Sequence, residues 1–275
     1  MRETRQKIKR LSKGVMFGNF FKLAVLLGLQ YVTTALLVRV FGLLGTQLRP
    51  DSVIRAFGLE INTVGLSASI LSAFLSAPLE LGIARYIMGL IRKEEVHFGD
   101  VFGWYGDFAK LARSIPFGFY SVICAVFQVA LFDIPLSYIQ SQLNIVLEDI
   151  EKQLVSNSET VIANYGLMDG RGIVISLGVM LLFALIATLF VAVPYVYADT
   201  GRIFYSVFSS PRIMFRYVWS YMLFVLSFSG FYIATVFTLG LMGVYLLPYF
   251  GVSKVMFVEF ARRRALPFDS GGEEQ

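Results

Sequence analysis

The sequence predicts an all-α integral membrane protein, a polytopic bundle of six transmembrane helices in a single domain over residues 1–275. Three observations lead to this prediction. Of the residues, 56% are hydrophobic and only 16% are charged, whereas about a quarter of an ordinary soluble domain is charged. Long apolar stretches recur along the chain. Lys and Arg gather in every second segment between these stretches, as in proteins that cross a membrane repeatedly.

Six stretches have roughly the length of about 20 residues that a helix needs to cross the hydrocarbon core of a bilayer. They are residues 23–44, 61–84, 116–138, 172–197, 217–238 and 239–261. The last two adjoin, and Gly240 and Gly243 allow a tight helical hairpin between them.

The distribution of Lys and Arg predicts that both termini are cytoplasmic, because positively charged short loops stay on that side of the membrane. In this orientation, 19 of the 24 Lys and Arg residues lie in cytoplasmic segments and 4 lie in outer loops. The basic segment 1–22 and the tail 262–275 are then cytoplasmic. There they would also contact anionic lipid headgroups.

Two cytoplasmic linkers, residues 97–115 and 202–216, mix aromatic and charged residues, which is typical of helices that lie at a membrane surface. Each linker follows a span that enters the cytoplasm. Spans two and three with their linker therefore resemble spans four and five with theirs, which indicates a weak internal duplication of two parallel units.

The longest outer loop, residues 139–171, begins with apolar residues at helical spacing, from Ile139 to Leu154, and acidic residues on other faces. This pattern predicts an acidic amphipathic helix. It is either a separate outer helix or an extension of span three that packs on the bundle.

Small residues recur every four positions in two spans: Gly65, Ser69, Ala73 and Ala77, and Ala184, Thr188 and Ala192. Such stripes let helix backbones approach closely in lipid. They indicate either packing within the bundle or an interface between two copies.

Charged residues inside spans are energetically costly unless they are paired or hydrated. Arg39 and Asp133 lie near the outer ends of spans one and three, at matched depth. They either pair across these helices or extend toward the outer headgroups.

Toward the cytoplasmic side, four charged residues at similar depth form a candidate intramembrane polar cluster: Glu80, Asp199, Lys254 and Glu259. Asp199 is three residues from Arg202 and could pair with it on one helix face. Glu80 needs a partner from another helix, and Lys254 is the obvious candidate. A structural pair, a site coupled to protons or ions, and contact with lipid headgroups all remain open.

Prolines lie inside three of the spans, each a few residues from these charges: Pro78, Pro194 and Pro248. Proline removes a backbone hydrogen bond and kinks or breaks a helix. Broken helices beside charges occur at the substrate sites of transporters, and also in plain helix bundles.

Signatures of enzymes and cofactors are absent from the sequence. It contains no phosphate-binding GxxxxGK[ST] loop, no HExxH and no GxSxG. Cys124 and His97 are the only residues of their kinds, which excludes a disulfide within the chain and a metal site made of several thiolates or imidazoles. We therefore expect no catalytic residues, no metal and no cofactor, and we do not expect an enzyme. The net charge of +5 is explained by the membrane and not by nucleic acid.

Several segments resemble an uncharacterised bacterial integral membrane family, catalogued as domain of unknown function 975. They are VPYVYAD at 193–199, GLMGVYLLPYFGVSKVMFVEFARR at 240–263 and GLIRKEEVHFGDVFGWYGDFAK at 89–110. The positions that match the family's recurring residues are Tyr195, Asp199, Pro248, Tyr249 and Glu259. The resemblance implies a compact multi-helix domain of the bacterial cytoplasmic membrane. It implies no particular activity. The acidic segment 139–171 departs from the family pattern.

The functional expectation from the sequence is a non-enzymatic accessory or scaffold component of a membrane complex, with a membrane-protein partner. The alternative is a transporter of ions or small molecules that uses the charges near Pro78, Pro194 and Pro248.

Overall fold

The protein is described by a computed structural model, which covers residues 2–48, 53–56, 59–156, 170–238 and 240–265. Six helical segments in it are long and apolar enough to cross a membrane. They are Arg5–Leu44, Ile70–Arg92, Phe108–Asn144, Gly170–Thr200, Ile203–Thr235 and Leu241–Arg264. The predicted multi-spanning helical architecture is thereby confirmed at the level of length and composition.

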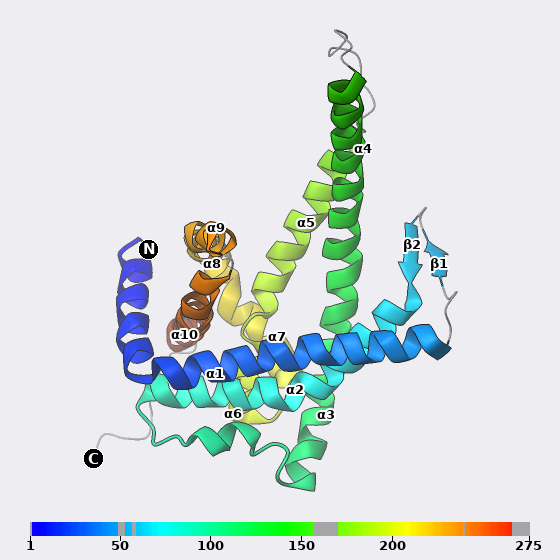
Figure 1. Cartoon of the computed structure of the whole chain (residues 1–275). Helices are drawn as coiled ribbons and strands as arrows, with labels where there is room; N and C mark the ends of the chain where they lie inside the picture. The colour runs from blue at the N-terminus through cyan, green and yellow to red at the C-terminus, as the bar shows by residue number, and fades with distance from the viewer. Residues whose placement is uncertain (1, 49–52, 57–58, 157–169, 239, 266–275) are drawn as a thin grey trace, which may run out of the picture.

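The first helical element, α1 (Arg2–Leu48), joins the basic N-terminal segment to span one. It bends at Asn19, whose backbone is not helical, so the segment before this residue lies at a steep angle to the rest of the helix (Figure 1). This segment packs on α10 (Leu241–Ala265), and the Ser12 hydroxyl donates a hydrogen bond to Met256 Sδ at 3.3 Å. The basic segment 1–22 is therefore part of the bundle as well as a charged end.

A short antiparallel hairpin of β1 (Val53–Ala56) and β2 (Leu59–Asn62) connects α1 to α2 (Thr63–Arg92). The sequence analysis did not predict these strands, and it placed residues 61 and 62 in span two. The hairpin forms where β-branched residues, which favour extended backbone, recur at Val53, Ile54 and Ile61.

The first linker predicted to be cytoplasmic, residues 97–115, is not one amphipathic helix. It contains the 3-10 helix η1 (Phe98–Phe102) and the beginning of α3 (Phe108–Gln128), which starts at the side-chain cap Asp107. Glycines at 99, 103 and 106 interrupt the helical pattern between the two elements. Val101 of η1 is fully buried against α2.

α3 continues through a π-helical turn, η2 (Val129–Asp133), into α4 (Ile134–Ser156). The amphipathic segment that begins at Ile139 is thus an extension of span three. α4 packs beside α5 (Gly170–Phe190), and the upper ends of this pair project beyond the other helices, while α5 also contacts α7 (Ile203–Met214) and α8 (Val218–Leu226) (Figure 1).

Span four breaks into two helices, α5 and α6 (Val193–Thr200), at a turn formed by Val191 and Ala192. Pro194 lies at the start of α6, where its missing N–H is tolerated best. Pro78 and Pro248 lie inside helices that continue past them. Of the three predicted breaks, only the one at Pro194 is present.

The second linker forms α7 (Ile203–Met214), which is followed by the 3-10 turn η4 (Phe215–Tyr217). Three serines of α7, at 206, 209 and 210, are buried. Ser210 donates to the Leu189 carbonyl oxygen at 2.7 Å and accepts from the Ala192 N–H at 3.2 Å. The serine face of α7 therefore supports the break between α5 and α6, while Phe204 and Phe208 face outward.

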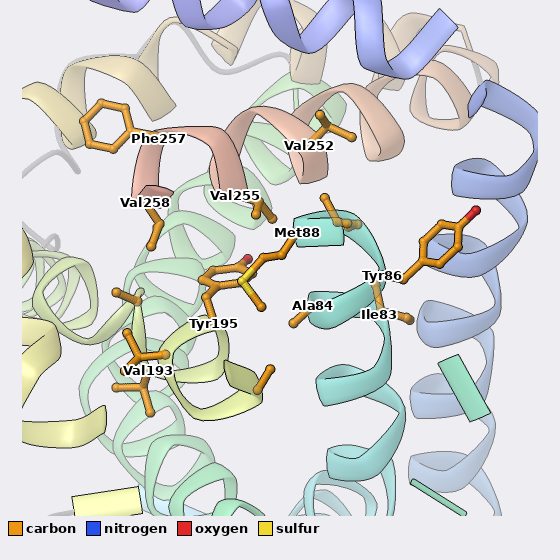
Figure 2. Packing of buried hydrophobic residues seen from close by; sticks show 14 of the residues in the cluster. Ile83, Ala84, Tyr86, Met88, Val193, Tyr195, Val252, Val255, Phe257 and Val258 are labelled. Carbon is orange, nitrogen blue, oxygen red and sulfur yellow. The ribbon is translucent and has the colours of Figure 1, made fainter. Parts of the chain in front are cut away.

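The last spans comprise α8 (Val218–Leu226), α9 (Ser229–Phe237) and α10, with Gly240 at a φ of 90° in the predicted hairpin turn. The core lies where α2, α6 and α10 meet. Figure 2 shows Tyr195 of α6 between Met88 of α2 and Val255 of α10. Of the predicted small-residue stripes, Ala77, Thr188 and Ala192 are buried, and the burial of Gly65 and Ser69 lies outside what the structure describes.

Candidate functional site

The structure divides the predicted polar cluster into two groups. Glu80 and Lys254 lie near each other, whereas Asp199 and Glu259 meet through an arginine that the sequence analysis did not include. Both groups lie between α2, α6 and α10, the helices that form the core.

The first group, which we call the inner polar site, consists of Glu80 of α2, Tyr195 of α6 and Lys254 of α10. Lys254 Nζ lies 5.8 Å from the centre of the Tyr195 ring, which is within the range of a cation–π interaction. Glu80 follows Pro78 by two residues, and Tyr195 follows Pro194 directly. The site therefore lies beside the break in span four.

Glu80 and Lys254 are close enough for their charges to interact through space. Within the described residues, however, no hydrogen bond or ion pair joins their side chains to each other or to any other group. Both side chains are half-buried, although the residues on either side of Glu80 in α2 are buried. The only fully buried side-chain oxygen or nitrogen without a partner in the described part is Ser253 Oγ.

Phenol and thiol groups surround the two charges. Tyr120 and Cys124 of α3 lie within the electrostatic reach of Glu80, and Tyr221 of α8 lies within that of Lys254. Tyr195 is 9% exposed and Tyr221 is 6% exposed. Three further helices, α3, α6 and α8, thus contribute phenol or thiol groups to the surroundings of Glu80 in α2 and Lys254 in α10.

The second group is an ionic cluster at the C-terminal ends of the same three helices, and we call it the ionic latch. Arg92 Nη2 lies 2.7 Å from Asp199 Oδ2, and Arg92 Nη1 lies 3.1 Å from Asp199 Oδ1. Arg92 Nε donates to Glu259 Oε1 at 2.7 Å. Arg262 Nη1 also donates to Asp199. The planar guanidinium group of Arg92 thus binds two carboxylates from two other helices.

The latch replaces the predicted pair of Asp199 and Arg202. α6 ends at Thr200, and Gly201 adopts a φ of 64° in the left-handed region. Arg202 therefore does not continue the helix face that carries Asp199, and it is exposed. The prediction of this pair was wrong because the helix ends one turn too early.

The predicted outer pair is not brought together in the described part of the chain. Arg39 of α1 and Asp133 of η2 are both exposed, and no ion pair joins them there. Asp133 ends the π-helical turn that joins α3 to α4.

The two remaining family-pattern positions lie in the aromatic core of α10. Pro248 is buried, and Tyr249 is 2% exposed. The Tyr249 ring lies 5.2 Å from Phe228, and Lys13 of α1 lies over it at 5.9 Å. These contacts are structural and include neither group of charges.

Sequence reasoning missed Arg92 and Arg262 because both lie in basic clusters that the positive-inside rule already explains. Both arginines lie in the last turn of a helix, α2 or α10. A basic side chain there interacts favourably with the negative C-terminal end of the helix dipole, so this position could have marked them as candidates for a structural role. Among the described residues, no group of three or more His, Cys, Asp or Glu side chains could hold a metal ion. Comparison with protein-family models, with curated proteins and with solved structures found no match.

Proposed function

We propose that the protein is a membrane transporter for small charged solutes, and that the inner polar site binds the solute. The observation that supports this proposal best is that Glu80 and Lys254 form no ion pair within the described residues, although each lies in a spanning helix and Lys254 lies over the Tyr195 ring beside the break in span four. A charge inside a span costs several kcal/mol unless it is paired or hydrated. A structural ion pair would have explained both residues, and the geometry gives no support to that explanation.

The break at Pro194 supports the same proposal. It leaves Tyr195 in the first turn of a short helix, which packs against α2 and α7. Helices interrupted near charged residues line the substrate sites of several transporter folds, where short half-helices can move relative to the longer ones. The ionic latch would then hold α2, α6 and α10 together on one side of the site.

We further propose that both termini are cytoplasmic in a bacterial cytoplasmic membrane, and that residues 97–115 and α7 lie at the inner surface against anionic headgroups. The distribution of Lys and Arg supports this orientation. The exposed aromatic side chains of α7, Phe204 and Phe208, together with Phe215 of η4, support its contact with lipid. Reporter fusions at the two ends would both have to be active in the cytoplasm.

Uptake into liposomes tests the transport proposal. The full chain is reconstituted, and the entry of labelled amino acids, amines, carboxylates and protons is compared with that into protein-free liposomes. At least one solute should enter faster. Glu80→Gln and Lys254→Met should each lower that rate by roughly tenfold or more, equivalent to about 1.4 kcal/mol of lost interaction. Glu95→Gln and Lys110→Met remove the same charges from exposed positions and should leave the rate unchanged.

A double-mutant cycle on stability provides the control for a structural pair. Because Glu80 and Lys254 do not form an ion pair, the coupling between Glu80→Gln and Lys254→Met should be below about 1 kcal/mol in the free energy of unfolding. Strong destabilisation by each single variant with recovery in the double variant would identify a structural pair and contradict the transport site.

A second candidate function is the accessory component of a membrane complex, which α4 supports. The uninterrupted helix from Phe108 to Ser156 is about 70 Å long at 1.5 Å per residue, against roughly 30 Å of hydrocarbon. α4 exposes Leu143 and Leu147 one turn apart. Purification in mild detergent followed by mass spectrometry separates the two candidates. A stoichiometric partner that no longer co-purifies with the double variant Leu143→Glu/Leu147→Glu would support the accessory role. Purification of this protein without any partner would contradict the accessory role.

A further inference from the structure

We infer that α7 and η4 form a surface that selects anionic phospholipid headgroups, and that this contact stabilises the break in span four. The inference rests on the proposed function only for the placement of α7 at the membrane surface. It adds a preference for the charge of the lipid and a coupling between the lipid and the fold. Both follow from the two faces of α7.

The outward face of this segment is aromatic. Four aromatic side chains on it are each exposed by 67% to 78%, namely Phe204, Phe208, Phe215 and Trp219. They follow one another at intervals of four, seven and four residues, which is the spacing of one helix face. Large apolar rings on one face of a helix are typical of segments that enter the boundary between headgroups and acyl chains.

Three arginines accompany the rings, and nothing in their surroundings neutralises them. They are Arg202, Arg212 and Arg216, all exposed. Within the described residues, their side chains make no hydrogen bond or ion pair. α7 packs mainly on α5, α6 and α10, whose only acidic residues are Asp199 and Glu259. The ionic latch binds both of these to Arg92, so the outward face of α7 keeps its positive charge and complements a negative partner.

The separation of the arginines favours a layer of headgroups over a single small anion. Arg202 precedes the first residue of α7 and Arg212 lies in its last turn. Ten residues of helix separate them by about 15 Å along the axis. One phosphate group cannot reach both ends, whereas the surface of a bilayer presents many. Phe204 and Phe208 lie between the two arginines, where apolar side chains can enter the same surface.

The opposite face of α7 contacts the break in span four. Ser210, which is completely buried, donates to the Leu189 carbonyl oxygen at 2.7 Å and accepts from the Ala192 N–H at 3.2 Å. These two backbone groups lie on either side of the point where α5 ends and α6 begins. Backbone groups at helix ends lack partners within the helix, and Ser210 supplies a partner to both.

The two faces couple lipid binding to the break. A ligand that binds one position of a helix better than others shifts the equilibrium toward that position. Headgroups that bind the outward face of α7 therefore also favour the position in which Ser210 reaches Leu189 and Ala192. We expect the break to be more rigid in an anionic bilayer than in a neutral one.

Quenching of Trp219 fluorescence by brominated lipids measures the headgroup contact. The chain has two tryptophans, so Trp104→Phe leaves Trp219 as the only reporter. The full chain with this substitution is reconstituted in phosphatidylcholine bilayers, in which brominated phosphatidylglycerol or brominated phosphatidylcholine replaces the same fraction of the lipid. Around Trp219, phosphatidylglycerol should be preferred by about fivefold, because an anionic headgroup attracts each arginine near it.

Two triple variants separate the local contact from net charge. Arg202→Gln/Arg212→Gln/Arg216→Gln should abolish the preference for phosphatidylglycerol. Lys93→Gln/Lys110→Gln/Arg113→Gln removes the same charge from exposed positions in another linker and should retain the preference. Equal quenching by the two lipids in the parent protein, or equal losses in the two triple variants, would overturn the inference.

The same measurement excludes other occupants of this face. Weak quenching of Trp219 by both brominated lipids would show that a protein covers the face, and the inference would be wrong. A preference that disappears when inorganic phosphate is added at constant ionic strength would identify free phosphate as the ligand and would also overturn it.

Hydrogen exchange at the Ala192 N–H measures the coupling. Exchange should be at least about threefold slower in bilayers that contain phosphatidylglycerol than in pure phosphatidylcholine, because a stabilised hydrogen bond opens less often. The triple arginine variant should remove this dependence on lipid although Ser210 is unchanged. Its three positions are exposed, so it is expected to fold. An exchange rate that does not depend on the lipid in the parent protein would overturn the coupling.

Neither readout requires transport. A preference for phosphatidylglycerol in a protein that takes up no solute would preserve the inference and remove the transport proposal. Uptake that depends on Glu80, in a protein without this preference, would preserve transport and overturn the inference.

Discussion

Replacement of Arg92 by methionine should lower the free energy of unfolding by about 3 kcal/mol, as measured by equilibrium unfolding in mixed micelles. Arg92 binds Asp199 through two nitrogens and Glu259 through a third. Removing one member of a buried charge pair typically costs 3–5 kcal/mol, because the remaining charge stays behind without its partner. The Arg92 side chain is 24% exposed, so water compensates part of this loss and the lower end of the range is expected.

Arg92→Lys tests the geometry of the contact separately from its charge. An ammonium group cannot reproduce the planar fork that binds two carboxylates, so lysine should restore only part of the stability. Arg202→Met removes the same charge from an exposed position and should change stability by less than about 0.5 kcal/mol. Equal losses in the free energy of unfolding for Arg92→Met and Arg202→Met would show that net charge determines the stability and that the contacts of the ionic latch do not contribute to it.

The approximate positions of the spans were predictable because each span is marked by many apolar residues over a long stretch of sequence, and no single residue decides the assignment. A membrane-spanning helix must be apolar over about 20 residues, and this requirement survives errors of several residues at each end. The boundaries were less predictable. The hairpin at 53–62 and the break at Val191 and Ala192 each depend on a few residues, and the second is supported by Ser210 of a helix that lies later in the sequence.

The partners of the charged side chains were harder to predict than their positions. Depth along a span placed Glu80, Asp199, Lys254 and Glu259 in one cluster, which the structure divides into two groups. Depth says nothing about which faces of the helices meet, and Arg92 reaches both acids only because α2, α6 and α10 converge at their C-terminal ends. Pairing by sequence distance failed at Asp199 for a local reason, because Gly201 ends the helix before Arg202.

Close backbone contacts were also beyond the sequence pattern. The predicted stripes marked small residues at regular spacing, whereas the described glycine with the least space for a side chain is Gly82, outside both stripes. A glycine at the contact point of two elements is recognisable only when the second element is known. Here that element is η1, which has no apolar periodicity of its own.

Replacement of Gly82 by alanine should destabilise the protein by about 2 kcal/mol or more. An added Cβ would lie 1.9 Å from the carbonyl oxygen and 2.8 Å from the carbonyl carbon of Val101. These atoms belong to the backbone, so no side-chain rotation relieves the clash, and η1 must move away from α2. Overpacking of this kind costs about 1–3 kcal/mol, and Val101 would also lose its completely buried environment.

Gly178→Ala is the matched control, because Gly178 lies in α5 and no atom lies within 4 Å of the position of its added Cβ. Alanine favours helix by up to about 1 kcal/mol over glycine, so this variant should be neutral or slightly more stable. Limited proteolysis provides a second readout. If Gly82 holds η1 against α2, protease should cut the segment between residues 93 and 107 faster in Gly82→Ala than in Gly178→Ala. Equal stability and equal cutting would mean that η1 does not pack against α2, and residues 97–115 would then be available to lie on the membrane surface as one helix.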